Sequence, residues 1–359
     1  MAELVDILKA TAQAGASDLH MVVGKPPMIR LQGRIIPLPG AAPVGVEDCK
    51  RMIYSVLMDE QKARFEEKWE LDCSVAVQGV ARFRINVFLQ KHGVAAVFRT
   101  ISSKIPTPAE LGLMPAMVNL TDLPRGLVLV TGPTGSGKST TLASLIELIN
   151  QKQQKHVLTI EDPIEFVYED KQSIILQREV GQQTKSFADA LKHSLRQDPD
   201  VILIGEMRDL ETIQLAITAA ETGHLCFGTL HTQDAPSTVD RIIDVFPAHQ
   251  QQQVRIQVAT VLQAVICQTL LPRKDGQGRV CAREFMKMTP AIGSIIREGK
   301  THLLYSAIES GNKFGMISMD QYLAFLVKGN HVTIENACSI AHDAEMVRKL
   351  VGMQTEPRE

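Results

Sequence analysis

The sequence predicts an α/β core preceded by a smaller α+β domain. Between about residues 126 and 245, short apolar runs alternate with runs of helical spacing, which is typical of a parallel sheet covered by helices. Before about residue 100, helical runs are mixed with strand-like runs joined by tight turns, which is typical of antiparallel pairing. A chain of 359 residues is long enough for both parts.

The smaller domain is expected to contain three helices and an antiparallel sheet. Apolar residues recur at helical spacing near the N-terminus and over residues 47–57 and 59–69. Strands are expected over residues 18–23, 26–38, 73–89 and 93–101, with turns at 32–33, 78–79 and 91–93. Arg82 and Arg84 are two apart in one of these strands, so they share a face that could present guanidinium groups to a phosphate; a solvated basic face is the alternative.

A proline-rich stretch then leads into the core. Residues 102–126 contain four prolines, and we expect a linker over 102–121. Strands are expected at 128–131, 156–160, 201–205 and 225–230, and helices at 137–150, 186–197, 209–222 and 236–245. From Gln250 onward the pattern predicts a largely helical chain.

The stretch GPTGSGKST lies between the first of these strands and its helix. Its pattern G-x-x-x-x-G-K-S predicts a loop whose bare backbone N–H groups surround a phosphate at a helix N-terminus. Lys138 would reach the outer phosphates of ATP, and the Ser139 hydroxyl would hold Mg²⁺. The expected nucleotide-binding residues are Gly132, Pro133, Thr134, Gly135, Ser136, Gly137, Lys138, Ser139 and Thr140.

Acidic residues follow the next two expected strands of the core. Glu161, Asp162 and Glu165 lie in TIEDPIEF, where a carboxylate beside a bound γ-phosphate could polarise the attacking water. Glu206 follows the aliphatic run VILIG and is expected on the Mg²⁺ side of the site. Solvated turns are the alternative, but ligands of such sheets bind at the carboxyl ends of the strands.

Two histidines flank the strand LCFGTL. His224 and His231 are seven residues apart, so they point to opposite faces and could not share a metal ion. His231, at the carboxyl end, is the one expected to face the nucleotide. A hydrogen-bonded structural role is the alternative for either residue.

Composition argues against several other classes of protein. The formal net charge is −2 and aromatic content is 4%, so nothing indicates a nucleic-acid partner. Six cysteines include no CxxC pair, which argues against a zinc site or a disulfide framework. The N-terminus lacks the pattern of a signal peptide, and no apolar run approaches the ~20 residues of a membrane span.

Taken in order, these motifs resemble those of the secretion ATPase superfamily, and most closely its PilT-type motors of type IV pilus retraction. The resemblance rests on GPTGSGKST, TIEDPIEF, DPDVILIGEMRDLETI and TAAETGHLCFGTLHT, with GASDLHM, PPMIRLQG and GVARFRINVF near the N-terminus. It implies a PAS-like domain over residues 1–101, a RecA-like P-loop ATPase domain over 122–288 and a helical region over 289–359. It also implies ATP hydrolysis with Mg²⁺ by a cytoplasmic homo-hexamer.

Site roles and partners follow from the same resemblance. Glu161 and its neighbours correspond to the catalytic acidic box, Glu206 to the Walker B acid, and His224 and His231 to the histidine box. Arg82, Arg84 and Arg99 match arginines that approach the phosphates. The expected partners are an inner-membrane pilus platform protein, through which the motor would be peripheral at that membrane, and a second retraction ATPase.

One family feature departs, and three other functions stay open. Residues 290–300, PAIGSIIREGK, correspond to the family's AIRNLIRE helix but have Gly293 and Ser294 where Arg and Asn are usual.

A pilus-assembly or type II secretion motor is the first alternative function, which the lack of a tetracysteine insertion disfavours. A RecA-like nucleic-acid translocase and a nucleotide-gated scaffold with little turnover are the others.

Overall fold

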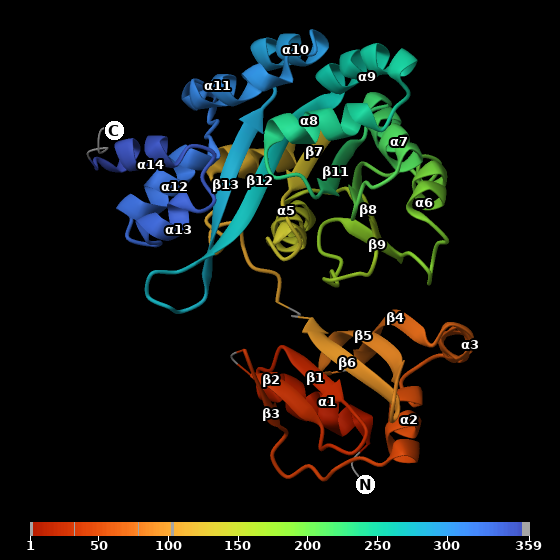
Figure 1. The fold of residues 1–359 in the computed structure, drawn as a ribbon. Coiled ribbons are helices and arrows are strands. Elements are labelled where there is room, and N and C mark those ends of the chain that lie inside the picture. Colours follow the sequence, from red (N-terminus) through yellow and green to blue (C-terminus); the bar gives the residue numbers. More distant parts are fainter. Residues whose placement is uncertain (1–2, 32, 78, 102–103, 354–359) are drawn as a thin grey trace. The chain divides into compact units, whose positions relative to one another are not determined.

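A computed structural model describes residues 3–31, 33–77, 79–101 and 104–353 (Figure 1). By their contacts the residues form two compact units. The smaller unit contains residues 1–105 together with 163–167, and the larger unit contains residues 106–162 and 168–359.

The smaller unit is a six-stranded antiparallel sheet with three helices. The strands run in the order β3-β2-β1-β6-β5-β4, and every neighbouring pair is antiparallel. Its elements are α1 (Leu4–Gln13), β1 (Asp18–Met21), β2 (Met28–Leu31), β3 (Arg34–Pro37), α2 (Val46–Tyr54), α3 (Asp59–Lys68), β4 (Glu70–Val77), β5 (Ala81–Gln90) and β6 (Gly93–Ile101). The predicted α+β character of this part is confirmed.

Alternation along β5 separates an apolar face from a charged face. Phe83 and Ile85 are fully buried in the core that α1 and α2 cover. Arg82 and Arg84 point to the opposite face because they occupy the intervening positions. Arg99 is paired with Arg84 across β5 and β6 and therefore lies on this same face.

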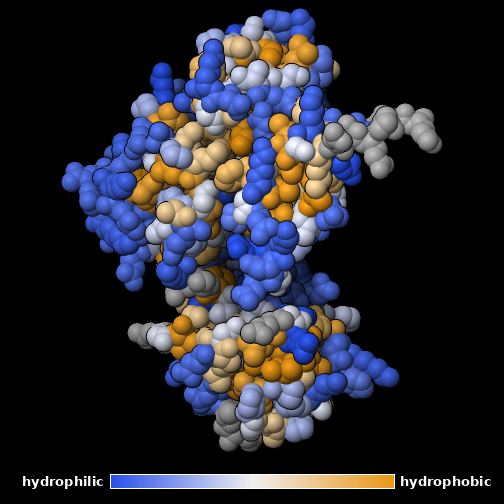
Figure 2. Space-filling view, turned by 90° about the vertical axis from the view of Figure 1, so that its left-hand side faces the viewer, coloured by the Kyte–Doolittle hydropathy of each residue, from blue (hydrophilic) through white to orange (hydrophobic). Residues whose placement is uncertain are grey.

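Apolar side chains are also exposed on the smaller unit, at its sheet edge. Figure 2 views the side of β2 and β3 and shows orange side chains at the surface of this unit. Edge strand β3 contributes Ile35 and Ile36, which are 47% and 37% exposed. An unpaired strand edge with apolar side chains is the kind of surface that other chains cover.

The larger unit is built on a seven-stranded mixed sheet. The order is β13-β12-β7-β11-β10-β8-β9, and only the β12–β13 pair is antiparallel. The strands are β7 (Gly126–Thr131), β8 (His156–Glu161), β9 (Ile174–Glu179), β10 (Val201–Ile204), β11 (Leu225–Leu230), β12 (Leu262–Pro272) and β13 (Arg279–Lys287). The carboxyl ends of β7, β8, β10 and β11 therefore meet at one edge of the sheet.

Helices cover both faces of this sheet. Leu127 and Leu129 of β7 point into the cluster formed with α6–α11, whereas Val128 and Val130 point into the cluster under α5. Figure 1 shows α7, α8 and α9 grouped together beside the sheet. The helices are α4 (Pro115–Val118), α5 (Lys138–Lys152), α6 (Phe187–Ser194), α7 (Leu210–Glu221), α8 (Ala235–Asp244), α9 (Ala248–Val261), α10 (Pro290–Arg297), α11 (Leu304–Glu309), α12 (Met319–Lys328), α13 (Ile334–Cys338) and α14 (Ala344–Val351).

The prediction of a largely helical chain after Gln250 is confirmed from Pro290 onward, where every element of the described residues is a helix, but it missed two strands before that point. Strands β12 and β13 form a long hairpin there, joined by a turn in which Gly276 and Gly278 have left-handed φ angles of 71° and 80°. Most of β12 is buried, so its side chains form a nearly continuous apolar run rather than an alternating one. Such a run does not by itself distinguish a strand from a helix.

Strand β9 is a second element that the sequence pattern did not indicate. It is parallel to β8 and follows it without an intervening helix. Because β9 is an edge strand, Ile174 and Leu176 are 59% and 47% exposed, and β9 lacks the buried apolar run by which the other strands of the core were predicted.

The α/β fold class predicted for this unit is confirmed. Among the described helices, none has the length and apolar character needed to cross a membrane.

Candidate nucleotide-binding site

The glycine-rich loop connects the end of β7 to the start of α5. Its glycines take backbone angles that other residues rarely adopt, with φ of 139° at Gly132, 78° at Gly135 and 90° at Gly137. Gly137 is the N-cap of α5, and no side chain caps this end of the helix. The first N–H groups of the helix therefore remain available to an anion, as the sequence predicted.

Lys138 folds back over this loop. Its Nζ donates to the carbonyl oxygens of Gly132 at 2.7 Å and Pro133 at 3.1 Å, and lies 3.5 Å from Nδ1 of His231. Pro133, Thr134 and Gly135 are exposed, so the loop is open to solvent at this point. The ammonium group thus lies beside the opening of the loop on two backbone carbonyls, which an incoming phosphate could replace.

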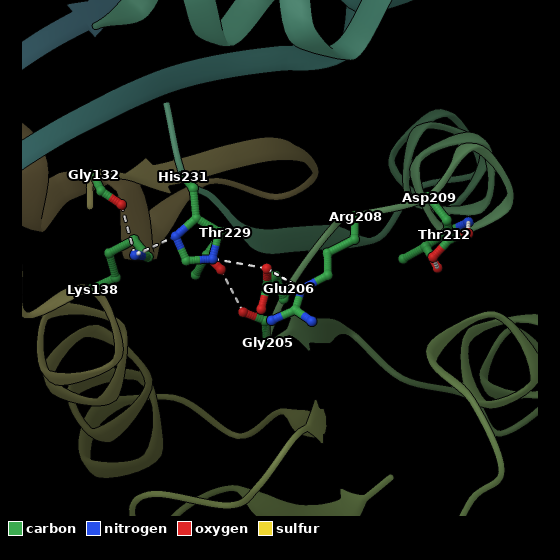
Figure 3. Close-up of polar contacts among 9 residues, drawn as sticks. All are labelled: Gly132, Lys138, Gly205, Glu206, Arg208, Asp209, Thr212, Thr229 and His231. Carbon is green, nitrogen blue, oxygen red and sulfur yellow. Dashed lines mark hydrogen bonds and ion pairs between the residues drawn. The ribbon is translucent and has the colours of Figure 1, made fainter. Parts of the chain in front are cut away.

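His231 connects the lysine to the acid that follows β10. Figure 3 shows its ring between Lys138 and Glu206, and Nε2 lies 2.8 Å from Oε1 of the carboxylate. The same carboxylate oxygen forms an ion pair with Nε of Arg208. Lys138 of the loop after β7, His231 after β11 and Glu206 after β10 therefore meet at one edge of the sheet, which is where the sequence predicted the site.

The charges around Glu206 keep it ionised. Partial burial raises its pKa, but the hydrogen bond and positive charge of Arg208, together with the neighbouring His231, outweigh burial and hold the pKa below its ordinary value. The side chain is 18% exposed, so these charges act through little solvent. Glu206 is therefore a carboxylate at neutral pH and can accept hydrogen bonds or bind a cation.

Glu161 lies at the end of β8, next to the loop that carries Glu206. The N–H of Gly205 donates to the carbonyl of Ile160 at 2.7 Å, and a Cβ atom on Gly205 would lie 3.2 Å from the Cα of Glu161. Only a glycine allows this approach without displacement of the backbone. The backbone at Glu161 is therefore in contact with Gly205, the residue that precedes Glu206.

Two polar side chains orient Glu161, and the sequence analysis missed both of them. The hydroxyl of Thr159 donates to Oε1 of Glu161 at 2.6 Å, and Nε2 of Gln177 donates to the same oxygen at 3.2 Å. Thr159 is two residues before Glu161 on β8, and Gln177 is opposite Thr159 on β9. The alternation of β8 could have indicated Thr159, but Gln177 depended on finding β9.

The other acids of TIEDPIEF lie differently. Asp162 is exposed, and its charge raises the pKa of Arg208, although the hydrogen bond from Arg208 to Glu206 is the larger cause. Glu165 falls in the segment 163–167, which groups with the smaller unit. Of the three acids, the structure of the larger unit brings Glu161 and Asp162 to the edge that carries Glu206.

His224 is not part of this cluster. It precedes β11, its Nδ1 lies 2.9 Å from the carbonyl oxygen of Ala219, and its backbone carbonyl accepts from Gly126 at the start of β7. His231 follows the other end of β11, so the two residues are about 20 Å apart by the rise of a strand. A catalytic role for His224 stays a prediction, and its contacts are those of a helix-end structural group.

Arg82, Arg84 and Arg99 of the smaller unit share one face, as the spacing of Arg82 and Arg84 predicted for the first two. Arg82 donates to the Ser74 hydroxyl at 2.6 Å, and Arg99 forms an ion pair with Asp18 at 3.0 Å. Arg99 is 68% exposed, so its guanidinium group remains accessible. The approach of these arginines to a nucleotide stays a prediction.

A phosphate-binding loop, a lysine beside its opening and two oriented carboxylates at the carboxyl edge of a parallel sheet define a P-loop ATPase core. The chain matches the family of type II/IV secretion system proteins over residues 3–314. It belongs to this family, in agreement with the resemblance of its motifs.

Individual relatives point to one branch of the family. The chain is 52% identical to the type IV pilus retraction ATPase PilT of Pseudomonas aeruginosa over 337 residues, which cover 93% of this chain and 97% of that protein. It is 50% identical to a twitching motility protein of Neisseria gonorrhoeae, over 89% of this chain and 85% of that protein. The crystal structure of the pilus retraction motor PilT with bound ADP superposes with a TM-score of 0.92 at 46% identity, covering 97% of this chain and all of that one.

Proposed function

We propose that this chain is an ATP-hydrolysing motor that powers type IV pilus retraction. The observation that carries the proposal is the connection from Lys138 through His231 to Glu206, in a chain that is 52% identical to a retraction ATPase over nearly its whole length. The connection joins the phosphate-binding loop to the strand ends that carry the acids. Binding of a nucleotide to the loop would therefore affect the acidic residues through Lys138 and His231.

ATP is the substrate in this proposal. The backbone N–H groups of residues 132–140 would surround its phosphates, and Lys138 would exchange the carbonyls of Gly132 and Pro133 for the outer phosphates. This exchange frees His231 from the ammonium group while its other nitrogen stays near Glu206. Glu161, which accepts hydrogen bonds from Thr159 and Gln177, would accept a further one from the attacking water.

The residues present also fit a Mg²⁺ ion. The described residues contain no group of three or more His, Cys, Asp or Glu side chains that could hold a metal. A cation at this site would thus be held mainly by phosphate oxygens and water, which is how Mg²⁺ commonly binds. The Ser139 hydroxyl and the Glu206 carboxylate are the protein oxygens we assign to it. When bound, the ion would neutralise charge on the β- and γ-phosphates.

We propose that the arginine face of the smaller unit completes the site. Arg82, Arg84 and Arg99 carry three positive charges on one side of the sheet, with Asp18 as a nearby counter-charge. Guanidinium groups that reach a γ-phosphate stabilise the charge that develops in phosphoryl transfer. If a neighbouring copy of the chain supplies these guanidinium groups, hydrolysis at one active site would be coupled to the next subunit.

We propose a homo-hexamer as the working form. Exposed apolar side chains on both units support assembly, including Ile35 and Ile36 on β3 and Ile174 and Leu176 on β9. In the cell the ring would act in the cytoplasm on an inner-membrane platform protein of the pilus, with a second retraction ATPase as a further partner. No nucleic-acid partner is proposed.

The helix that departs from the family pattern is α10. Gly293 packs toward α9, and an added Cβ atom would lie 3.2 Å from the guanidinium of Arg297, a flexible side chain that can move. Ser294 donates to Glu298 at 3.0 Å on the exposed side of the same helix. The departure therefore leaves the helix intact; Gly293 is buried, whereas Ser294 changes the outer side of the helix, where a partner would bind.

Deletion of the gene tests this function. Cells without the protein should carry excess pili that do not retract, whereas cells without pili would indicate an assembly motor instead. Complementation with Lys138→Ala should not restore retraction, because the loop loses the charge that binds the outer phosphates. Lys152→Ala, at the exposed end of the same helix, is the matched control and should restore it.

A further inference from the structure

Strand β12 passes directly beside the phosphate-binding loop. Cys267 pairs with Thr131, the last residue of β7, so Gln268 is level with Gly132. A Cβ atom on Gly132 would lie 2.1 Å from the carbonyl oxygen of Gln268, and one on Gly137 would lie 3.3 Å from its Nε2. The backbone and side chain of Gln268 therefore follow the loop from its first glycine to its last.

The amide of Gln268 connects the loop to the helix. Nε2 donates to the backbone carbonyl of Ser136 at 2.8 Å, and Oε1 accepts from the hydroxyl of Thr141 in the first turn of α5 at 3.0 Å. Gln268 is 2% exposed and Thr141 is 1% exposed, so water does not compete for these hydrogen bonds. An uncharged amide suits this position because it donates and accepts at once.

The bond to Ser136 sets the direction of one peptide group. In a planar trans peptide the C=O of Ser136 and the N–H of Gly137 point in opposite directions. With the carbonyl turned toward β12, the N–H of Gly137 points away from β12, to the side on which the loop binds phosphate. If the carbonyl were released, this peptide could rotate and present oxygen instead of N–H to an anion.

We propose that Gln268 is a positioning residue that keeps the loop in its phosphate-binding conformation. This inference rests on the proposed function, in which the loop binds ATP. Gln268 does not touch the nucleotide and acts through the Ser136–Gly137 peptide and Thr141. Because the same N–H groups bind ADP and ATP, loss of Gln268 should weaken both nucleotides alike.

The test is binding of ADP with Mg²⁺, together with steady-state ATP hydrolysis. Gln268→Met keeps the length of the side chain and removes both hydrogen bonds. The dissociation constant of ADP and the KM for ATP should each rise about tenfold, whereas kcat at saturating ATP should stay within about twofold of wild type. Gln263→Met, on the same strand but beside Gly126, is the matched control and should leave both constants unchanged.

Thr141→Val provides a second variant that removes one of the two hydrogen bonds without changing side-chain shape. It should raise the same two constants in the same direction by a smaller factor. Wild-type constants in Gln268→Met would overturn the inference, as would a fall in kcat with unchanged ADP affinity. Failure of the wild-type protein itself to bind ADP would remove the nucleotide assignment, and this inference with it.

Discussion

A buried carboxyl group on β13 should make the stability of the larger unit depend on pH. Glu284 is 1% exposed, and Oε1 accepts the N–H of Ala235 at the start of α8 at 2.8 Å. Burial is the main cause that raises its pKa to about 7; the nearby Asp234 acts in the same direction, and the hydrogen bonds of two backbone N–H groups and Cys267 act against it. The protonated form is therefore favoured in the folded state.

The size of the effect follows from the two pKa values. Between about pH 4.5 and pH 7 the folded protein retains a proton that the unfolded chain has lost, so the free energy of unfolding decreases as pH rises. The contribution is fully present below pH 4.5 and is lost once pH passes 7. A difference of roughly 2.5 pKa units corresponds to about 3 kcal/mol.

Glu284→Gln should remove this dependence, because glutamine keeps an acceptor for Ala235 and has no proton to lose. Urea unfolding of the larger unit, followed at fixed protein concentration, should show the variant more stable than wild type at pH 8 and similar to it near pH 4.5. Glu211→Gln, on an exposed position of α7, is the matched control. An equal pH slope in wild type and Glu284→Gln would refute the reasoning.

Three further predictions concern the site and its supports. Glu161→Gln and Glu206→Gln should each keep nucleotide affinity but lose on the order of 10²-fold in turnover, and wild-type rates in both would remove their assigned roles. Inactive Lys138→Ala and Arg84→Ala chains should regain part of their activity when mixed if the arginine acts on a neighbouring copy; no recovery in rings shown to be mixed would place it in its own chain. Asp234→Ala should destabilise the larger unit by about 1 kcal/mol, because the carboxylate accepts a backbone N–H in the first turn of α8; an unchanged urea midpoint would contradict this.

Local patterns were sufficient to predict much of the site. The glycines and Lys138 occupy a fixed spacing between a strand and a helix, and Glu206 directly follows an aliphatic strand. Each of these signals is contained in a short stretch of chain. The structure adds the distances that join them, such as the contact of His231 with both Lys138 and Glu206.

Residues that support the site from other strands were not predictable in this way. Gln177 reaches Glu161 from an edge strand with exposed apolar residues, and Gln268 reaches the loop from a strand that the pattern assigned to a helical region. Their importance depends on which strands are neighbours, and that information is not contained in any short stretch. An amide side chain within the apolar run VICQTLL was the one local sign that Gln268 has a special environment.

The position of β7 within its sheet has a consequence during synthesis of the protein. Both of its neighbours are made much later, since Leu225 pairs with Gly126 and Ile266 pairs with Val130. These pairings close loops of roughly 100 and 140 residues, which is slow for a growing chain. When the glycine-rich loop has just been synthesised, the two strands that flank β7 in the sheet, β11 and β12, have therefore not yet been made. Competence to bind nucleotide should appear only after β12 has left the ribosome, so that fragments ending before it would be inert toward ATP.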